Sequence, residues 1–248
     1  MKRINICLDE EMCSIGLERW IGLECIFKEG QRILIVGPSG SGKSVFATSL
    51  LGKVSLYMHT PIIYLIDPKG IDFRFCEGCS NYYAIDNAQE GIEKFFDLFE
   101  NRLRNSATHH QPAILFVDEL SSLILSCSKK EGDLLKNKMA RILNLSRALN
   151  ITVISSLQRA DAMLFDNGAR DNYNIRFLMG GIANNRESVA MIASEYKEFI
   201  KPCPTGIGYM ITDNGIKKIR SVMPRNTEKL HGVIREAVNR TPQSDAEQ

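Results

Sequence analysis

Short apolar runs alternate with longer segments of helical periodicity along most of the chain. Five of these runs are nearly all apolar, which is typical of strands buried on both faces of a parallel sheet; they span 33–36, 62–66, 113–117, 152–155 and 175–179. In the segments around them apolar side chains recur at helical spacing, which predicts helices at about 43–53, 89–104, 133–149 and 186–195. This alternation predicts an α/β fold with a mostly parallel central sheet flanked by helices.

The two ends of the chain depart from this pattern. The first thirty residues look like an antiparallel accessory piece, and 207–222 predicts a hairpin that turns at Asp213-Asn214-Gly215. A helix and a polar tail are expected at the C-terminal end. We therefore expect three parts: an accessory segment at 1–30, a main domain at 31–225, and the helix with its tail at 226–248.

Length and composition fit one globular domain. A chain of 248 residues is near the upper limit of a single α/β domain, and 44% hydrophobic with 24% charged residues is ordinary for a globular protein. No apolar stretch approaches the roughly 20 residues needed to cross a bilayer, and acidic residues follow the first basic ones too closely for a signal peptide. We therefore expect a cytoplasmic protein with no transmembrane segment.

Neither charge nor cysteine content points to a particular ligand. The net charge of +2 is too small to indicate nucleic acid, so any DNA contact must come from local basic clusters. Seven irregularly spaced cysteines indicate reduced thiols rather than a disulfide framework. Cys76 and Cys79 have the spacing of half a zinc site, but no second close pair of Cys or His completes it in the sequence.

The segment that follows the first apolar run carries the clearest chemistry. It matches G-x-x-x-x-G-K-[ST], a P-loop, in which glycines let backbone N–H groups converge on a phosphate. Lys43 adds a charge for the β- and γ-phosphates, and Ser44 offers a hydroxyl to Mg²⁺. The N-terminus of the helix expected here also favours an anion. We therefore expect ATP and Mg²⁺ at a site formed by Gly37, Pro38, Ser39, Gly40, Ser41, Gly42, Lys43, Ser44 and Val45.

A second chemical signal is an apolar strand that ends in two carboxylates, Asp118 and Glu119, the arrangement called Walker B. At the edge of the sheet that holds the P-loop, Asp118 would bind Mg²⁺ and Glu119 would orient and polarise the attacking water. An Asp-Glu pair after a strand could instead cap the following helix. Its position after a P-loop favours catalysis, and Glu119 favours hydrolysis over a nucleotide-binding switch.

Two further strand ends carry polar groups, Asp67-Pro68-Lys69 after the second run and Gln158-Arg159 after the fourth. The order P-loop, Asp-Pro-Lys, Asp-Glu, Gln-Arg resembles the FtsK/SpoIIIE family of hexameric DNA-pumping ATPases, from about residue 31 to residue 209. The chain departs from the family at the fourth strand end, where Leu157-Gln158-Arg159-Ala160 replaces the common Thr-Gln-Arg-Pro. That difference puts the geometry of the following loop in question.

The resemblance implies a RecA-like P-loop NTPase fold with the motor domain at 31–225. The P-loop would bind ATP and Mg²⁺, the pair Asp118-Glu119 would serve hydrolysis, and Gln158 would sense the γ-phosphate. Asp67 and Lys69 would shape the edge of the nucleotide site or pair with each other, unless they only form a turn set by Pro68.

The resemblance also implies an arginine finger, a guanidinium that one subunit of a ring inserts into its neighbour's site. Arg102 falls where the family carries a Glu-Arg-Arg helix and is the first choice. Arg104, Arg147 and Arg176 are its rivals. Each of these arginines could equally be a solvated surface charge.

Contacts with DNA in such a motor would come from small basic loops that hold phosphates in a central pore. Lys129 and Lys130, in the segment 126–132, are expected to be such contacts, and 159–170 is the other candidate segment. A lysine pair on a surface loop could also be merely solvated.

These inferences together predict a homohexameric ring ATPase that moves double-stranded DNA in a conjugative or mobile-element setting. Membrane or relaxase proteins of a transfer system would be further partners. The chain looks like a bare motor core without the membrane region and winged-helix module of longer family members. Two alternatives remain open: a type VII secretion-like ATPase that moves proteins, and a nucleotide-gated binding module.

Overall fold

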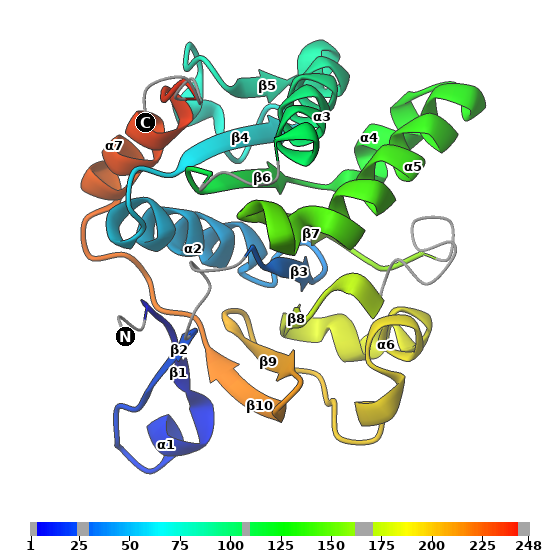
Figure 1. Cartoon of the computed structure of the whole chain (residues 1–248). Coiled ribbons are helices and arrows are strands. Elements are labelled where there is room, and N and C mark those ends of the chain that lie inside the picture. Colours follow the sequence, from blue (N-terminus) through cyan, green and yellow to red (C-terminus); the bar gives the residue numbers. More distant parts are fainter. Residues whose placement is uncertain (1–3, 24–29, 106–109, 162–170, 243–248) are drawn as a thin grey trace.

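The computed structural model describes residues 4–23, 30–105, 110–161 and 171–242 of the 248-residue chain. Its strands form one ten-stranded sheet in the order β2-β1-β10-β9-β8-β3-β7-β6-β4-β5, with helices on both faces (Figure 1). No helix of the described residues is long and apolar enough to span a membrane.

The centre of the sheet is parallel, and α-helices form the crossovers from β3 to β4, from β5 to β6 and from β6 to β7. All five predicted strands are present, and a sixth, β5, pairs with β4 at the edge. Only three half-buried residues form β5, so it gives no apolar run in the sequence. The parallel strands are β8 (Ile175–Met179), β3 (Arg32–Val36), β7 (Ile151–Leu157), β6 (Ala113–Val117), β4 (Ile62–Asp67) and β5 (Tyr82–Ala84).

Two apolar layers pack on the sheet, one on each face. Along β3, Leu34 and Val36 face one layer, whereas Ile33 and Ile35 face the other. Four helices cover the first face: α3 (Ala88–Arg104), α4 (Leu120–Ser126), α5 (Lys129–Leu145) and α6 (Arg186–Ile192). Two cover the second: α2 (Lys43–Tyr57) and α7 (Thr227–Val238). Burial on both faces explains why these strands are almost wholly apolar.

An antiparallel extension continues the sheet beyond β8. It consists of the predicted hairpin, β9 (Ile207–Thr212) and β10 (Gly215–Arg220), and of β1 (Ile4–Asp9) and β2 (Trp20–Leu23), joined by α1 (Glu10–Ser14). Arg220 fixes α1 on this hairpin, since its guanidinium donates to both carboxylate oxygens of Glu10 at 2.6 and 3.0 Å. β1 pairs antiparallel with both β2 and β10, so the described part of the first segment has the predicted antiparallel pairing.

The helix predicted at 133–149 begins earlier and ends earlier than its apolar stripe indicates. It starts at Lys129 because Ser128 and Glu131 form a capping box, in which each side chain accepts a hydrogen bond from the other's backbone. After Leu145 the chain tightens into a 3₁₀ turn, Ser146–Leu149. Lys129 and Lys130 therefore lie in the first turn of a capped helix, which corrects the expectation of a flexible loop.

Candidate active site

The P-loop connects β3 to α2 at the carboxyl edge of the sheet, and its glycines are required by its backbone. Gly40 and Gly42 have φ of +78° and +87°, values that other residues rarely adopt. A Cβ at Gly37 would lie 2.5 Å from Ser41 Oγ. The loop is therefore a compact nest of N–H groups at the start of a fifteen-residue helix, which is suited to phosphate.

Lys43 is buried beneath this loop with its ammonium among acceptors from two other strands. Its Nζ donates to Ser156 Oγ at 2.9 Å and lies 3.7 Å from Asp118 Oδ1 and 3.8 Å from Glu119 Oε2. The sequence reasoning did not include Ser156. Its signal was a pair of serines inside an otherwise apolar buried strand, since Ser155 and Ser156 are both fully buried in β7.

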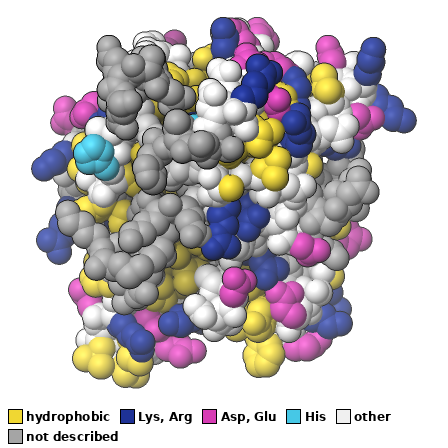
Figure 2. Space-filling view, in the orientation of Figure 1, with side chains coloured by type: hydrophobic (Ala, Val, Ile, Leu, Met, Phe, Trp, Pro, Cys, Tyr) yellow, Lys and Arg dark blue, Asp and Glu magenta, His cyan; other side chains and the backbone are white. Residues whose placement is uncertain are grey.

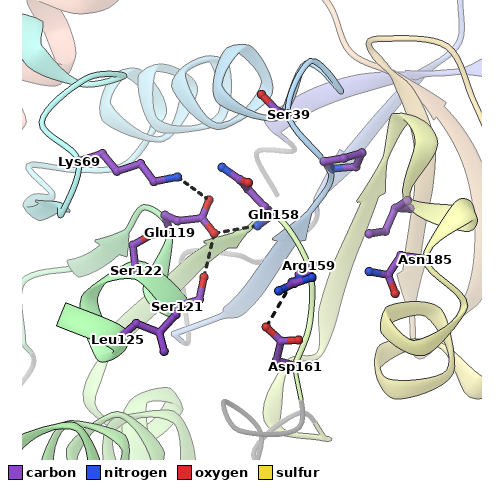
Figure 3. Close-up of a pocket in the computed structure, with 12 residues that line it drawn as sticks. Ser39, Lys69, Glu119, Ser121, Ser122, Leu125, Gln158, Arg159, Asp161 and Asn185 are labelled. Atoms are coloured by element: carbon purple, nitrogen blue, oxygen red, sulfur yellow. Dashed lines mark hydrogen bonds and ion pairs between the residues drawn. The ribbon is translucent and has the colours of Figure 1, made fainter. Parts of the chain in front are cut away.

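Asp118 and Glu119 directly follow β6, which ends at Val117, and Glu119 has left-handed backbone angles, φ 49° and ψ 58°. Such a conformation costs about 1 to 3 kcal/mol in a residue with a side chain, and it persists only where the surroundings hold it. Here Ser121 Oγ and the backbone N–H of Gln158 donate to Oε1 at 2.9 and 3.0 Å (Figure 3). The carboxylate is thus fixed at the centre of the site.

The oxygen atoms near Lys43 fit a hard divalent cation. Asp118 is 3% exposed, and its Oδ1 has no hydrogen-bond partner among the described residues. Burial raises the pKa of Asp118, an effect that the ammonium of Lys43 opposes. No group of three or more His, Cys, Asp or Glu side chains in the described ranges is arranged to enclose a metal. The donor set therefore suits Mg²⁺, which is usually held by one or two protein groups together with phosphates and water.

The turn after β4 is organised by Asp67, which is fully buried. Its carboxylate accepts hydrogen bonds from the backbone N–H groups of Gly70 and Phe73 at 2.9 and 3.2 Å and from the Tyr82 hydroxyl at 3.2 Å. Burial and the neighbouring Asp67 charge raise the pKa of Tyr82. Asp67 therefore fixes the turn after β4, which is compatible both with the expected strand-end turn and with a role in shaping the edge of the site.

Lys69, carried by the same turn, reaches the Glu119 carboxylate instead of Asp67. Its Nζ lies 3.6 Å from Glu119 Oε2, so the expected Asp67–Lys69 pair is replaced by a Lys69–Glu119 pair. Further along the turn, Asp72 Oδ2 accepts a hydrogen bond of 2.7 Å from Ser44 Oγ. Sequence reasoning missed Asp72, because nothing in its spacing indicates a contact with the P-loop.

A cavity of about 370 Å³ opens beside Glu119 (Figure 3). Gln158 lies on its wall at the end of β7, and Arg159 pairs there with Asp161 at 3.6 Å. Gln158 thus shares this cavity with Glu119. The residues around it are Pro38, Ser39, Lys69, Glu119, Ser121, Ser122, Leu125, Gln158, Arg159, Asp161, Ile182 and Asn185.

A second cavity, of about 340 Å³, lies at the other end of the P-loop. The segment before β9 is tied to this loop, since Thr205 Oγ1 donates to the Gly40 carbonyl at 2.7 Å and Gly206 N donates to the Ser41 carbonyl at 2.9 Å. Pro38 and Ser39 face the first cavity, whereas Gly42 and Val45 face the second. The remaining residues around the second cavity are Thr205, Gly206, Ile207, Arg220, Ser221 and Met223.

Arg102 does not have the position of an arginine finger. It is 4% exposed, and its guanidinium donates to the carbonyls of Leu149, Asn150 and Gln111 at 3.1, 3.4 and 2.6 Å. These carbonyls precede β7 and β6, at the end of the sheet opposite the P-loop. The expectation for Arg102 is therefore corrected: a side chain bound to internal carbonyls cannot also reach a neighbouring subunit.

The other arginines and lysines that were predicted to act as a finger or as DNA contacts are exposed on the surface, apart from Arg176, which is hydrogen-bonded within the chain. Arg104 and Arg147 are exposed. Arg176 donates to the Ile192 carbonyl and to Glu195. Lys129 and Lys130 are exposed at the start of α5. Most of the candidate segment 159–170 lies outside the described residues.

A protein-family model matches the part of the chain that carries this site. The model of the ATPase family associated with various cellular activities (AAA) matches residues 33–177, which include the strands that end at the P-loop, at Asp118 and at Gln158. The chain belongs to this family. The match covers more than half of the chain and identifies a P-loop ATPase that binds nucleotide.

Curated relatives of this AAA ATPase share only part of its sequence. Protein SAV of Sulfolobus acidocaldarius is 25% identical over 138 residues, which are 53% of this chain and 14% of that protein. The human ATPase family gene 2 protein homolog A is 29% identical over 103 residues, which are 40% of this chain and 8% of that protein. The chain thus spans a small part of the length of these relatives.

Solved structures confirm the predicted fold. EssC (ATPases 2 and 3) from Geobacillus thermodenitrificans has a TM-score of 0.72 at 16% identity, over 96% of this chain and 48% of that one. The pCW3 conjugation coupling protein TcpA, in monomer form with ATPγS, has a TM-score of 0.70 at 18% identity, over 94% and 71%. The cytoplasmic domain of the type VII secretion ATPase EccC from Thermomonospora curvata has a TM-score of 0.66 at 19% identity, over 95% and 31%. At these identities the likeness is one of fold.

Proposed function

We propose that this AAA ATPase is the motor domain of a ring of the FtsK/SpoIIIE type, which hydrolyses Mg·ATP to translocate double-stranded DNA. The observation that carries the hydrolytic part is the meeting of Lys43, Asp118 and Glu119 within 4 Å at the carboxyl edge of the sheet. A P-loop lysine beside two carboxylates is the arrangement that ATP hydrolysis requires. The cargo rests on the resemblance of the four strand ends to that family.

ATP would draw the Lys43 ammonium from Ser156 and the carboxylates to the β- and γ-phosphates. Ser44 and Asp118 would hold Mg²⁺, which neutralises charge on the phosphates. Glu119 would accept a proton from the attacking water as the water oxygen bonds to the γ-phosphorus and the bond to the ADP oxygen breaks. Ser121 and Gln158 would keep the Glu119 carboxylate oriented for this transfer, as they do in the free protein.

The two cavities would define the direction of the nucleotide in the site. The γ-phosphate end would face the cavity with Glu119 and Gln158. The base would enter the second cavity, whose walls include the apolar side chains of Val45, Ile207 and Met223. A flat aromatic base suits a cavity of this kind, because apolar contacts bind it without a fixed hydrogen-bond pattern.

A homohexameric ring would place the cavity beside Glu119 near a neighbouring subunit, which would supply a finger. Since Arg102 is used internally, the exposed Arg104 and Arg147 are the stronger candidates. DNA would be held by its phosphates at small basic sites such as Lys129 and Lys130. On the face seen in Figure 2, Lys and Arg side chains are interspersed with Asp and Glu, which favours local contacts over one large basic surface.

A protein cargo is the second candidate. It is favoured by the fold that this chain shares with EccC and EssC, of which EccC is a type VII secretion ATPase. The two candidates share the nucleotide chemistry and differ only in what the ring moves.

The deciding experiment measures ATPase rate with and without long duplex DNA over a series of salt concentrations. For a DNA motor we expect stimulation at low salt that declines steeply as salt rises, because each phosphate contact releases counterions. Absence of stimulation at low salt would exclude duplex DNA as the cargo. The Glu119→Gln variant is the background control: it should bind ATP yet lose about 10² to 10⁴ in turnover, the usual contribution of a general base.

A further inference from the structure

Asp72 contacts the P-loop although it belongs neither to that loop nor to the Asp118-Glu119 pair. Its Oδ2 accepts the hydroxyl proton of Ser44 at 2.7 Å. Ser44 is the P-loop residue whose oxygen would bind Mg²⁺. The contact therefore joins a carboxylate of the β4 turn to a metal ligand.

The direction of this hydrogen bond matters for metal binding. A hydroxyl has one proton and two lone pairs, and an ionised carboxylate can only accept. Because Asp72 takes the proton, both lone pairs of Ser44 remain free for a cation. Asp72 also adds a negative charge close to the cation, and a charged acceptor makes the stronger hydrogen bond.

The β4 turn holds Asp72 firmly in place. The next residue, Phe73, is fully buried, and its ring packs edge-on against Phe116 with centroids 4.8 Å apart. The backbone N–H of Phe73 donates to buried Asp67 at 3.2 Å. The backbone at Asp72 is therefore anchored beside the P-loop, and its side chain is held there by the hydrogen bond to Ser44.

A second, independent observation points to a cation at the same place. Asp118 Oδ1 is buried without a hydrogen-bond partner among the described residues, although the side chain is 3% exposed. This oxygen lies beside the start of the P-loop helix, since it is 3.7 Å from Nζ of Lys43, the residue before Ser44. A divalent cation between Ser44 and Asp118 would supply the missing partner.

The geometry points to Asp72 as a positioning residue for Mg²⁺, which orients the Ser44 hydroxyl and strengthens cation binding from the second coordination shell. This inference rests on the proposed Mg·ATP function and adds to it a residue outside the P-loop and Walker B motifs. Loss of such outer groups typically weakens metal affinity about 10- to 100-fold.

The test compares wild-type protein with Asp72→Asn, Asp72→Glu and the control Asp86→Asn, an exposed carboxylate in the 3₁₀ turn before α3. Binding of a fluorescent ATP analogue is followed as MgCl₂ is added, and bound Mn²⁺ is counted by electron paramagnetic resonance. We expect the half-maximal metal concentration to rise at least about tenfold in Asp72→Asn, to recover in Asp72→Glu, and to stay unchanged in the control. Binding of the analogue in EDTA should be equal in all four proteins.

Different outcomes refute the role of Asp72 and the proposed Mg·ATP function. If wild-type protein binds the analogue with a clear metal dependence and Asp72→Asn gives the same midpoint, only the role of Asp72 is refuted. A lower midpoint in Asp72→Asn would also refute it, because Asp72 would then compete with the metal for Ser44. If wild-type protein shows no metal dependence, the Mg·ATP function itself is wrong.

Discussion

Lys69 Nζ lies 3.6 Å from Glu119 Oε2, so an ion pair joins the turn after β4 to the residues that follow β6. Lys43 approaches the same oxygen from the P-loop, at 3.8 Å. Lys43 is expected to move to the phosphates when ATP binds, whereas Lys69 is not expected to bind them. Lys69 is therefore the cation that would stay with Glu119 during turnover.

Replacing Lys69 by Met should lower kcat about three- to tenfold and leave KM nearly unchanged, because the pair orients a group used in the transition state. Lys69 is 38% exposed, so solvent screens part of the interaction and the effect should stay below that of a fully buried pair. Steady-state ATPase kinetics measure this. Lys69→Arg should retain most activity, and Lys94→Met, at an exposed position on α3, is the control. A rise in kcat would mean that Lys69 restrains Glu119 instead of orienting it.

Met223→Ala should weaken ATP binding about three- to tenfold, since a thioether in contact with an aromatic ring contributes about 0.3 to 1.5 kcal/mol. Met223 is 70% exposed, so its removal should not harm the fold. Competition by inorganic tripolyphosphate, which has no base, should be unaffected. Ile15→Ala, at 67% exposure in the N-terminal segment, is the control. Equal losses for ATP and tripolyphosphate would place the base outside the second cavity.

Arg102→Ala should lower the free energy of unfolding by about 3 kcal/mol, because hydrogen bonds from a charged group to buried carbonyls are lost and the carbonyls are left unsatisfied. Denaturant unfolding measures this, with the exposed Arg104→Ala as control, for which we expect a change within about 0.5 kcal/mol. Folded Arg102→Ala protein should keep its ATPase activity. If it is inactive and recovers when mixed with Lys43→Ala protein, Arg102 acts between subunits after all.

Lys129→Ala combined with Lys130→Ala should reduce stimulation by duplex DNA and leave the DNA-free ATPase rate unchanged. Two lost phosphate contacts should lower the slope of log affinity against log salt by about 2. DNA-binding titrations at several salt concentrations give this slope. Lys94→Ala should leave it as it is. An unchanged slope in the double variant would show that both lysines are solvated surface charges.

Prediction from the sequence was most reliable where a single local rule decides the structure. Strands buried on both faces must be nearly all apolar, and all five predicted ones are present. Prediction from the sequence was least reliable where the sequence context of a residue fits two different structural roles. From its place near a helix end, Arg102 looks like a solvated surface charge or an arginine finger. Its guanidinium instead donates to three carbonyls that precede β6 and β7. Lys129 and Lys130 look like a loop until the capping box of Ser128 and Glu131 is recognised.

The sequence by itself determined the P-loop, the Asp118-Glu119 pair and the parallel sheet, because glycine conformations, strand-end carboxylates and apolar runs depend on neighbours within a few residues. Only the tertiary structure decided which groups meet them. Ser156 lies in β7, whereas Lys69 and Asp72 lie in the turn after β4. Their contacts with Lys43, Glu119 and Ser44 depend on strand order and on the anchoring of the β4 turn. Such contacts have no local period or spacing, so they are fixed only when the sheet assembles.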